Sequence, residues 1–133
     1  MHVAASGKVF LAFGDPAETE AFLAGPLDAV TPNTVTDPDR LREDLRTIRE
    51  RGFSITRGEL EEGLNAVAAP IHASDGSVVA VIVVSGPEYR TGEDRLHAAG
   101  EAASEAAATV SRQLGWVTGR GAVPVTAALH DHV

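Results

Sequence analysis

The stretch that decides the fold spans residues 65–87 and reads NAVAAPIHASDGSVVAVIVVSGP. It consists of two apolar runs joined at Asp75-Gly76, a pair that favours a tight hairpin because both residues tolerate the positive φ of a type I′ turn. In the second run, residues 77–85, valine, alanine and isoleucine occupy positions that face both sides of a strand. A strand with two apolar faces is covered on both, so we predict an antiparallel hairpin in the middle of the fold.

Helical patterns precede the hairpin. Residues 4–13 and 16–24 predict two short helices separated by a Gly-Asp-Pro break, and Ser6 is placed to cap the first of them. Residues 26–36 contain no periodic pattern and predict a loop.

The clearest helix begins after Asp37-Pro38, since Asp is a favoured N-cap and Pro suits the first helical position. Its leucines and isoleucine recur at i, i+4 and i+7, and Gly52 is a typical residue just past a helix end. Residues 53–56 alternate and predict a short strand, and residues 57–63 form a polar connection into the hairpin.

A long alanine-rich helix is predicted after the hairpin, capped by Thr91 with Asp94 three residues on, and terminated by Gly115. The sequence contains no internal repeat and no dividing linker. The order of elements predicts an α+β fold class with an antiparallel sheet flanked by helices. Three strands make a small sheet, so either the tail adds a strand or further strands come from elsewhere.

Composition places the chain among ordinary globular proteins and excludes several kinds of site. The 133 residues are 44% hydrophobic and 23% charged, which suits one domain with a modest core. The absence of cysteine excludes disulfides and thiolate metal sites. The net charge of −8 and the lack of a basic stripe argue against nucleic-acid contact by this chain. No run is long enough to span a bilayer and the start is too polar for a signal peptide, so we expect a cytoplasmic protein.

Three segments carry a resemblance to a known family. They are HVAASGKVFLAF (residues 2–13), TDPDRLREDLRTIRERGFSI (residues 36–55) and GELEEGLNAVAAPIHASDGSVVAVIVVSGPEYR (residues 58–90), followed by the long helix. Together they resemble the effector-binding domain of IclR-type bacterial transcriptional regulators, over about residues 2–114. The pieces RERGF, GLNAVAAPI and SGP are specific in combination.

The resemblance implies a GAF-like domain, with a curved antiparallel sheet, helices on one side and a small-molecule pocket on the other. Full-length members carry an N-terminal winged helix-turn-helix that binds promoter DNA, work as dimers or tetramers, and respond to a small organic acid. The winged helix-turn-helix and the family's first strands have no counterpart here. We therefore expect residues 1–115 to form a partial effector-binding domain and residues 116–133 to form a poorly ordered tail.

The resemblance also implies a ligand site at the start of the first helix. A helix start offers free N–H groups and the positive end of the dipole, which suits an anion. The positions that match the family's pocket are Ala5, Ser6, Gly7, Thr56, Leu64, Ala66, Val83 and Ser85. With three apolar side chains among the strand positions, we expect an aromatic or aliphatic carboxylate, whose charged group is held by Ser6 and Ser85.

Each of these residues also has a purely structural interpretation, which the sequence leaves open. Ser6 is suited to cap a helix and Ser85 to end a strand before a turn. Leu64, Ala66 and Val83 would be core residues in any fold with this pattern.

Evidence for catalysis or metal binding is weak. Glu59, Glu61 and Glu62 read as a solvated acidic loop, and His130-Asp131-His132 lies in the tail. No nucleophile elbow, phosphate loop or dinucleotide fingerprint is present, so we expect neither an enzyme nor a cofactor. The leading interpretation is a ligand-sensing regulatory domain. The alternative is a truncated, free-standing subunit that pairs with full-length relatives without binding a ligand.

Overall fold

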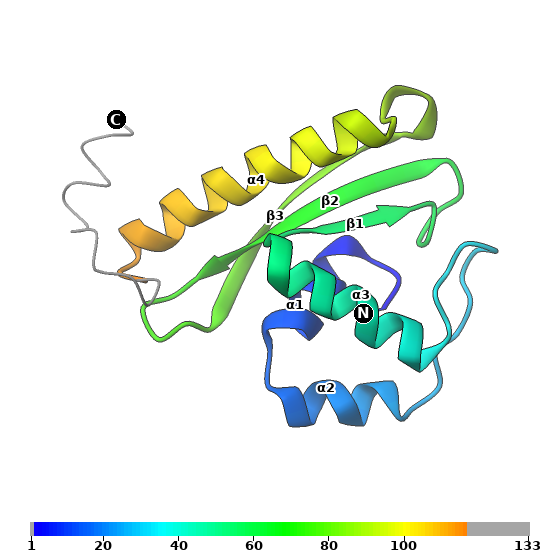
Figure 1. The fold of residues 1–133 in the computed structure, drawn as a ribbon, viewed down its shortest axis with the longest axis horizontal. Coiled ribbons are helices and arrows are strands. Elements are labelled where there is room, and N and C mark those ends of the chain that lie inside the picture. The colour runs from blue at the N-terminus through cyan, green and yellow to red at the C-terminus, as the bar shows by residue number, and fades with distance from the viewer. Residues whose placement is uncertain (1, 117–133) are drawn as a thin grey trace.

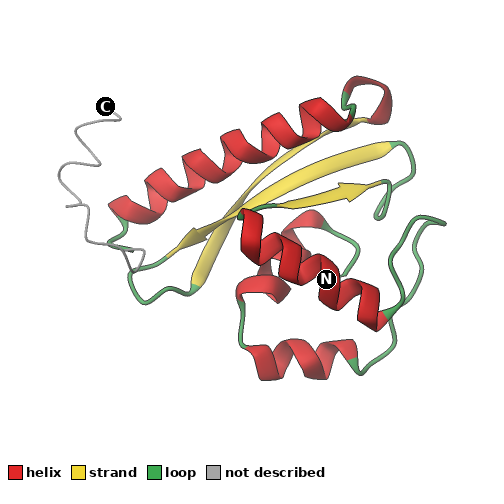
Figure 2. Ribbon diagram, viewed as in Figure 1, coloured by secondary structure: helices red, strands yellow, loops and turns green. Residues whose placement is uncertain are grey.

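The computed structural model describes residues 2–116 and confirms the α+β class. The elements in chain order are α1 (Ala5–Phe13), α2 (Pro16–Leu23), α3 (Pro38–Arg51), β1 (Ser54–Arg57), β2 (Leu64–His72), β3 (Val78–Pro87), the 3₁₀ helix η1 (Glu88–Arg90) and α4 (Glu93–Gln113). Figure 1 traces this order along the chain, and Figure 2 separates the helices from the sheet. The expectations for the tail and for His130-Asp131-His132 lie outside the described residues, apart from Trp116.

The three strands form one antiparallel sheet in the order β1-β2-β3. The hairpin is therefore confirmed, but its predicted central position is wrong for β3, which forms a sheet edge. Val79, Val83 and Val84 on β3 are 54%, 49% and 47% exposed. The reason is that α1 on one face and α4 on the other both pack mainly on β2, which leaves β3 partly uncovered on both faces within residues 2–116.

The turn at Asp75-Gly76 is also not of type I′. Gly76 has φ +89°, but no non-glycine residue in the described part of the chain has a positive φ. The Gly76 amide donates to the Ala73 carbonyl, and the Asp75 carboxylate accepts hydrogen bonds from the amide and hydroxyl of Ser77. These bonds lower the pKa of the Asp75 carboxyl. They also hold the Asp75 backbone outside the left-handed region, and the loop is one residue longer than predicted.

Helices cover both faces of the sheet, not one face as the resemblance implied. On one side, α4 buries Leu96, Ala103 and Ala107 against Phe53 and Ile55 and their neighbours on β2. Figure 1 shows α4 on that side and α1, α2 and α3 on the other.

The opposite layer consists of two apolar clusters. Ala5 and Val9 of α1 pack directly on Ala68 of β2. Farther from the sheet, leucines of α1, α2 and α3, including Leu11, Leu23 and Leu45, pack against one another. This layer fixes the position of α1 over the sheet, which matters for the site described below.

Two predicted helix caps are wrong and one is confirmed. Asp37 accepts the capping bond of α3, and Gly52 closes that helix with φ +90°, as predicted. The N-cap of α1 is Ala4, so Ser6 lies inside the first turn and makes no side-chain capping bond. The N-cap of α4 is Gly92, and the Thr91 hydroxyl donates to the Pro87 carbonyl.

Candidate functional site

The strand positions predicted for the site meet on one face of the sheet. Thr56, Ala66 and Ser85 are direct cross-strand partners, so they form a continuous row across all three strands. Leu64 and Val83 are two residues from members of that row and share its face, because side chains alternate along a strand.

The start of α1 lies beside this row. Ala68 pairs with Val83 in the sheet and packs against Ala5, the first residue of α1. The Ser54 hydroxyl, which is buried, donates to the Ala5 carbonyl at 2.8 Å and ties the helix start to β1. Ser54 is not among the predicted site residues, and its only signal in the sequence is a polar residue at a buried strand position.

The helix start keeps its free donors. The first intrahelical bond runs from the Lys8 amide to the Ala4 carbonyl at 3.0 Å, so the amides of Ala5, Ser6 and Gly7 precede the helical ladder. These amides and the dipole end can accept an anion. The eight predicted residues therefore come together as a helix start above a strand row.

The burial of the row changes from one strand to the next. Thr56 on β1 is buried, Leu64 and Ala66 on β2 are half-buried, and Val83 and Ser85 on β3 are exposed. The candidate site therefore has a closed side at β1 and an open side at β3.

A buried ion cluster, which was not predicted from the sequence, lies next to the helix start. Lys8 is 1% exposed, and its Nζ donates to Glu59 Oε1 at 2.5 Å and to Asp44 Oδ2 at 3.2 Å. Glu59 is 7% exposed, so the prediction of a solvated loop is wrong for this residue but correct for Glu61 and Glu62. A lysine flanked by apolar residues on an inward helix face was the available signal, because buried charges need partners.

The loop that carries Glu59 is held from a second direction. The Thr34 hydroxyl donates to the Glu59 carbonyl at 2.7 Å, and the Thr31 hydroxyl donates to the Gly58 carbonyl at 2.6 Å. The ion cluster thus joins α1, α3 and the β1–β2 loop into one unit next to the candidate site.

Arg57 forms a bidentate pair with Glu93 and links the end of β1 to the start of α4. The hydrogen bond from Arg57 lowers the pKa of Glu93 below its ordinary value. Both side chains are about half exposed, so the pair contributes modestly to stability.

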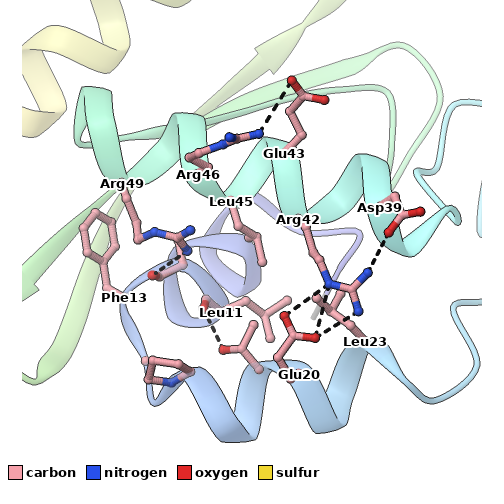
Figure 3. A pocket seen from close by; sticks show the side chains of 14 residues that line it. Leu11, Phe13, Glu20, Leu23, Asp39, Arg42, Glu43, Leu45, Arg46 and Arg49 are labelled. Carbon is pink, nitrogen blue, oxygen red and sulfur yellow. Dashed lines mark hydrogen bonds and ion pairs between the residues drawn. The ribbon is translucent and has the colours of Figure 1, made fainter.

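A cavity of about 730 Å³ lies elsewhere, between α1, α2 and α3, and none of the eight predicted residues lines it. Figure 3 shows Leu11, Leu23 and Leu45 at its centre and charged side chains along its rim. Arg42 pairs with Glu20 at 2.9 Å and with Asp39 at 2.8 Å. These pairs largely neutralise the charges of Arg42, Glu20 and Asp39, so this part of the rim does not favour a charged ligand.

Metal binding finds no support in the described part of the chain, where no group of three or more His, Asp or Glu residues could hold an ion. Among the same residues, no helix combines the length and the apolar character needed to cross a membrane.

Comparison with known proteins identifies the family. The family model described as "Bacterial transcriptional regulator IclR C-terminal" matches residues 1–112. The chain belongs to the IclR family. Its similarity to the HTH-type transcriptional repressor AllR of Escherichia coli K12 is 35% identity over 116 residues, which cover 86% of this chain and 43% of the repressor. The relatives of this IclR-family chain are thus named as regulators of transcription and not as enzymes, and the chain spans less than half of their length.

Solved structures agree with this assignment. The crystal structure of Thermotoga maritima IclR superposes with a TM-score of 0.81 at 34% identity, over 86% of this chain and 47% of that one. An IclR homologue from Microbacterium hydrocarbonoxydans, complexed with 4-hydroxybenzoate, has a TM-score of 0.75 at 32% identity, over 85% of this chain and 45% of that one.

Proposed function

We propose that this chain is the effector-sensing part of an IclR-type regulator and binds a small aromatic or aliphatic carboxylate between the start of α1 and the strand row. The observation that carries the proposal is the position of the free amides of α1 beside the continuous row Thr56, Ala66 and Ser85.

Each side of the site has a distinct part in recognition. The amides of Ala5, Ser6 and Gly7, together with the hydroxyls of Ser6 and Ser85, bind the carboxylate. Leu64, Ala66 and Val83 contact the carbon body of the ligand. The complex of the Microbacterium homologue with 4-hydroxybenzoate favours an aromatic acid over a short keto acid.

Regulation then follows from differential affinity. The effector binds more tightly to one quaternary arrangement of a dimer or tetramer than to another, and that preference is coupled to DNA binding by a winged helix-turn-helix outside these residues. This chain contacts the effector and other copies of itself, and not the DNA.

Calorimetry on the 133-residue chain tests the proposal with 4-hydroxybenzoate and glyoxylate as probes. We expect 4-hydroxybenzoate to bind more tightly, and Ser85→Ala to weaken its binding roughly tenfold through loss of one hydrogen bond to a charged group. Ser74→Ala is the matched control, because Ser74 is exposed in the turn at the far end of the hairpin. Tighter binding of glyoxylate, or equal losses in both variants, would contradict the proposal.

A second candidate function rests on the exposed edge of β3, where Val79 and Val84 are about half exposed. In this alternative, the chain pairs with longer relatives through its edge strand and binds no effector. Co-purification with a winged-helix relative, without any stabilisation by acids, would favour the alternative. Stabilisation by an aromatic acid in the absence of such a relative would favour the sensor.

A further inference from the structure

A second, polar cavity of about 290 Å³ lies between α1, α3 and the end of β1. None of the eight residues of the proposed effector site lines it. Its charged lining consists of Lys8, Arg40, Asp44, Arg51, Arg57 and Glu59.

The charges of this cavity do not balance. Four cations line it against two carboxylates, and both carboxylates are bound to Lys8. Arg57 is paired with Glu93, which lies outside the lining. Across residues 2–116, no carboxylate lies within ion-pair distance of Arg40 or Arg51. This local excess of positive charge stands out because the whole chain carries a net charge of −8.

Arg51 is held in place without a counter-ion. Its Nε donates to the Phe53 carbonyl at 2.8 Å, and its guanidinium lies over the Phe53 ring at 4.8 Å from the centroid. Burial lowers the pKa of Arg51 most, and the positive charge of Arg57 lowers it further. The carboxylate of Asp44 acts in the opposite direction. The two guanidinium groups therefore repel each other, and Asp44, the carboxylate that acts on both of them, is already bound to Lys8.

We propose that this cavity binds a compact polyvalent oxyanion, of the phosphate or short dicarboxylate class, through Arg40, Arg51 and Arg57. Planar guanidinium groups match the oxygen geometry of both classes and can share one anion. Lys8 takes no part, because its ammonium group is buried and already bound to Glu59 and Asp44, whereas Arg57 is about half exposed beside its own pair with Glu93. Those two carboxylates also oppose an incoming anion, so binding is weak and weakens further with added salt.

The test uses the 133-residue chain with inorganic phosphate and malonate as probes, each compared with sodium chloride at equal ionic strength. Binding is measured by NMR titration or calorimetry, and thermal unfolding gives an independent readout. We expect phosphate, malonate or both to bind and to raise the midpoint of unfolding above that in chloride. The arm that responds identifies the class of anion.

Arg40→Gln is the decisive variant, since Arg40 is exposed and makes no ion pair within residues 2–116, so its loss leaves the fold intact. We expect roughly fivefold weaker anion binding in this variant. Arg46→Gln is the matched control, because Arg46 is also exposed on α3 but lines the other cavity.

Three results would overturn the proposal: equal responses to the polyvalent anions and chloride, equal losses in the two arginine variants, or abolition of the response by Ser85→Ala. The last result would place the anion in the effector site instead. Conversely, if the 133-residue chain responds to phosphate but does not bind 4-hydroxybenzoate, that result would contradict the proposed effector site and not the proposed anion cavity.

Discussion

Replacing Lys8 with methionine should destabilise the protein by about 3 kcal/mol, because the substitution leaves a buried carboxylate without its cation. Methionine has a similar length to lysine and keeps the side chain packed, so the substitution removes charge with little loss of volume. The Nζ of Lys8 lies 2.5 Å from Glu59 Oε1, and both side chains are more than nine-tenths buried.

The magnitude follows from what each carboxylate retains. Breaking a buried pair by removing one partner costs about 3–5 kcal/mol. Glu59 keeps one hydrogen bond, from the Arg57 amide to Oε2 at 3.3 Å, and the Asp44 side chain is 40% exposed and can be solvated. Both features favour the lower end of that range.

Urea unfolding of Lys8→Met measures the loss, and two double variants test its cause. Adding Glu59→Gln should recover a large part of the stability, since it removes the unpaired buried charge. Adding Asp44→Asn should recover little, because water already reaches that carboxylate. A loss below about 1 kcal/mol, or equal recovery in the two double variants, would refute the reasoning.

Lys8 is the only lysine in the chain, so amine labelling offers a second readout. A buried ammonium group should react with an acylating reagent only when the domain opens. Labelling of Lys8 in the native protein as fast as in urea would contradict its burial.

Three further predictions concern the sheet, its ion pair and its edge. Gly100→Ala should cost about 2 kcal/mol in thermal unfolding, because the new Cβ would lie 2.2 Å from the Phe53 ring and α4 would have to move. Arg57→Gln should destabilise the protein by about 0.5 kcal/mol at pH 7. Because the folded-state pKa of Glu93 is depressed, the stabilisation by the Arg57–Glu93 pair should be lost as pH falls through that pKa, and the difference between wild type and variant should shrink. Val84→Lys should reduce self-association in light scattering, since a charge on an exposed edge strand opposes pairing with another strand.

Controls for these predictions use sites without the relevant contact. Gly25→Ala should be nearly neutral, because its new Cβ meets the nearest atom at an ordinary 3.5 Å. Glu93→Gln should remove the same pH dependence as the arginine variant. Ala98→Lys adds the same charge on the exposed side of α4 and should leave self-association unchanged. If the pH dependence of stability persists in both Arg57→Gln and Glu93→Gln, the explanation by their ion pair is contradicted. If Ala98→Lys reduces self-association as much as Val84→Lys, the explanation by edge-strand pairing is contradicted.

Local signals predicted the elements well, because each rests on a few neighbouring residues. Asp37-Pro38 and Gly52 bound α3 as expected, since capping and left-handed glycine geometry depend on local backbone chemistry. The caps at Ser6 and Thr91 failed although their signals were equally local: in one case, the Thr91 hydroxyl donates to the carbonyl of Pro87, four residues before it, and Gly92 takes the N-cap position. In the other case, α1 begins at Ala5, ahead of Ser6 and not after it, so Ser6 lies within the first turn.

The candidate site was found through resemblance, and its geometry depends on register. No sequence pattern shows that Thr56, Ala66 and Ser85 face one another, because cross-strand pairing is set by the turn and by the packing of both sheet faces. The burial of Glu59 could not be predicted from its neighbouring residues. Its neighbours Glu61 and Glu62 are exposed, and only the position of Lys8 on another element distinguishes it from them.

The open side of the site and the exposed edge of β3 are physically connected. Val83 and Ser85, which line the open side of the site, belong to the same edge strand, whose outer edge has no strand partner among the described residues. A strand that pairs with this edge would order β3 and fix the Ser85 hydroxyl before the effector arrives, so the effector would lose less entropy on binding. By reciprocity, the effector would then strengthen pairing at the edge by the same factor. If both proposals hold, the sensor and the pairing subunit would be thermodynamically coupled, and the affinity for an aromatic acid would rise with the concentration of the chain that covers β3.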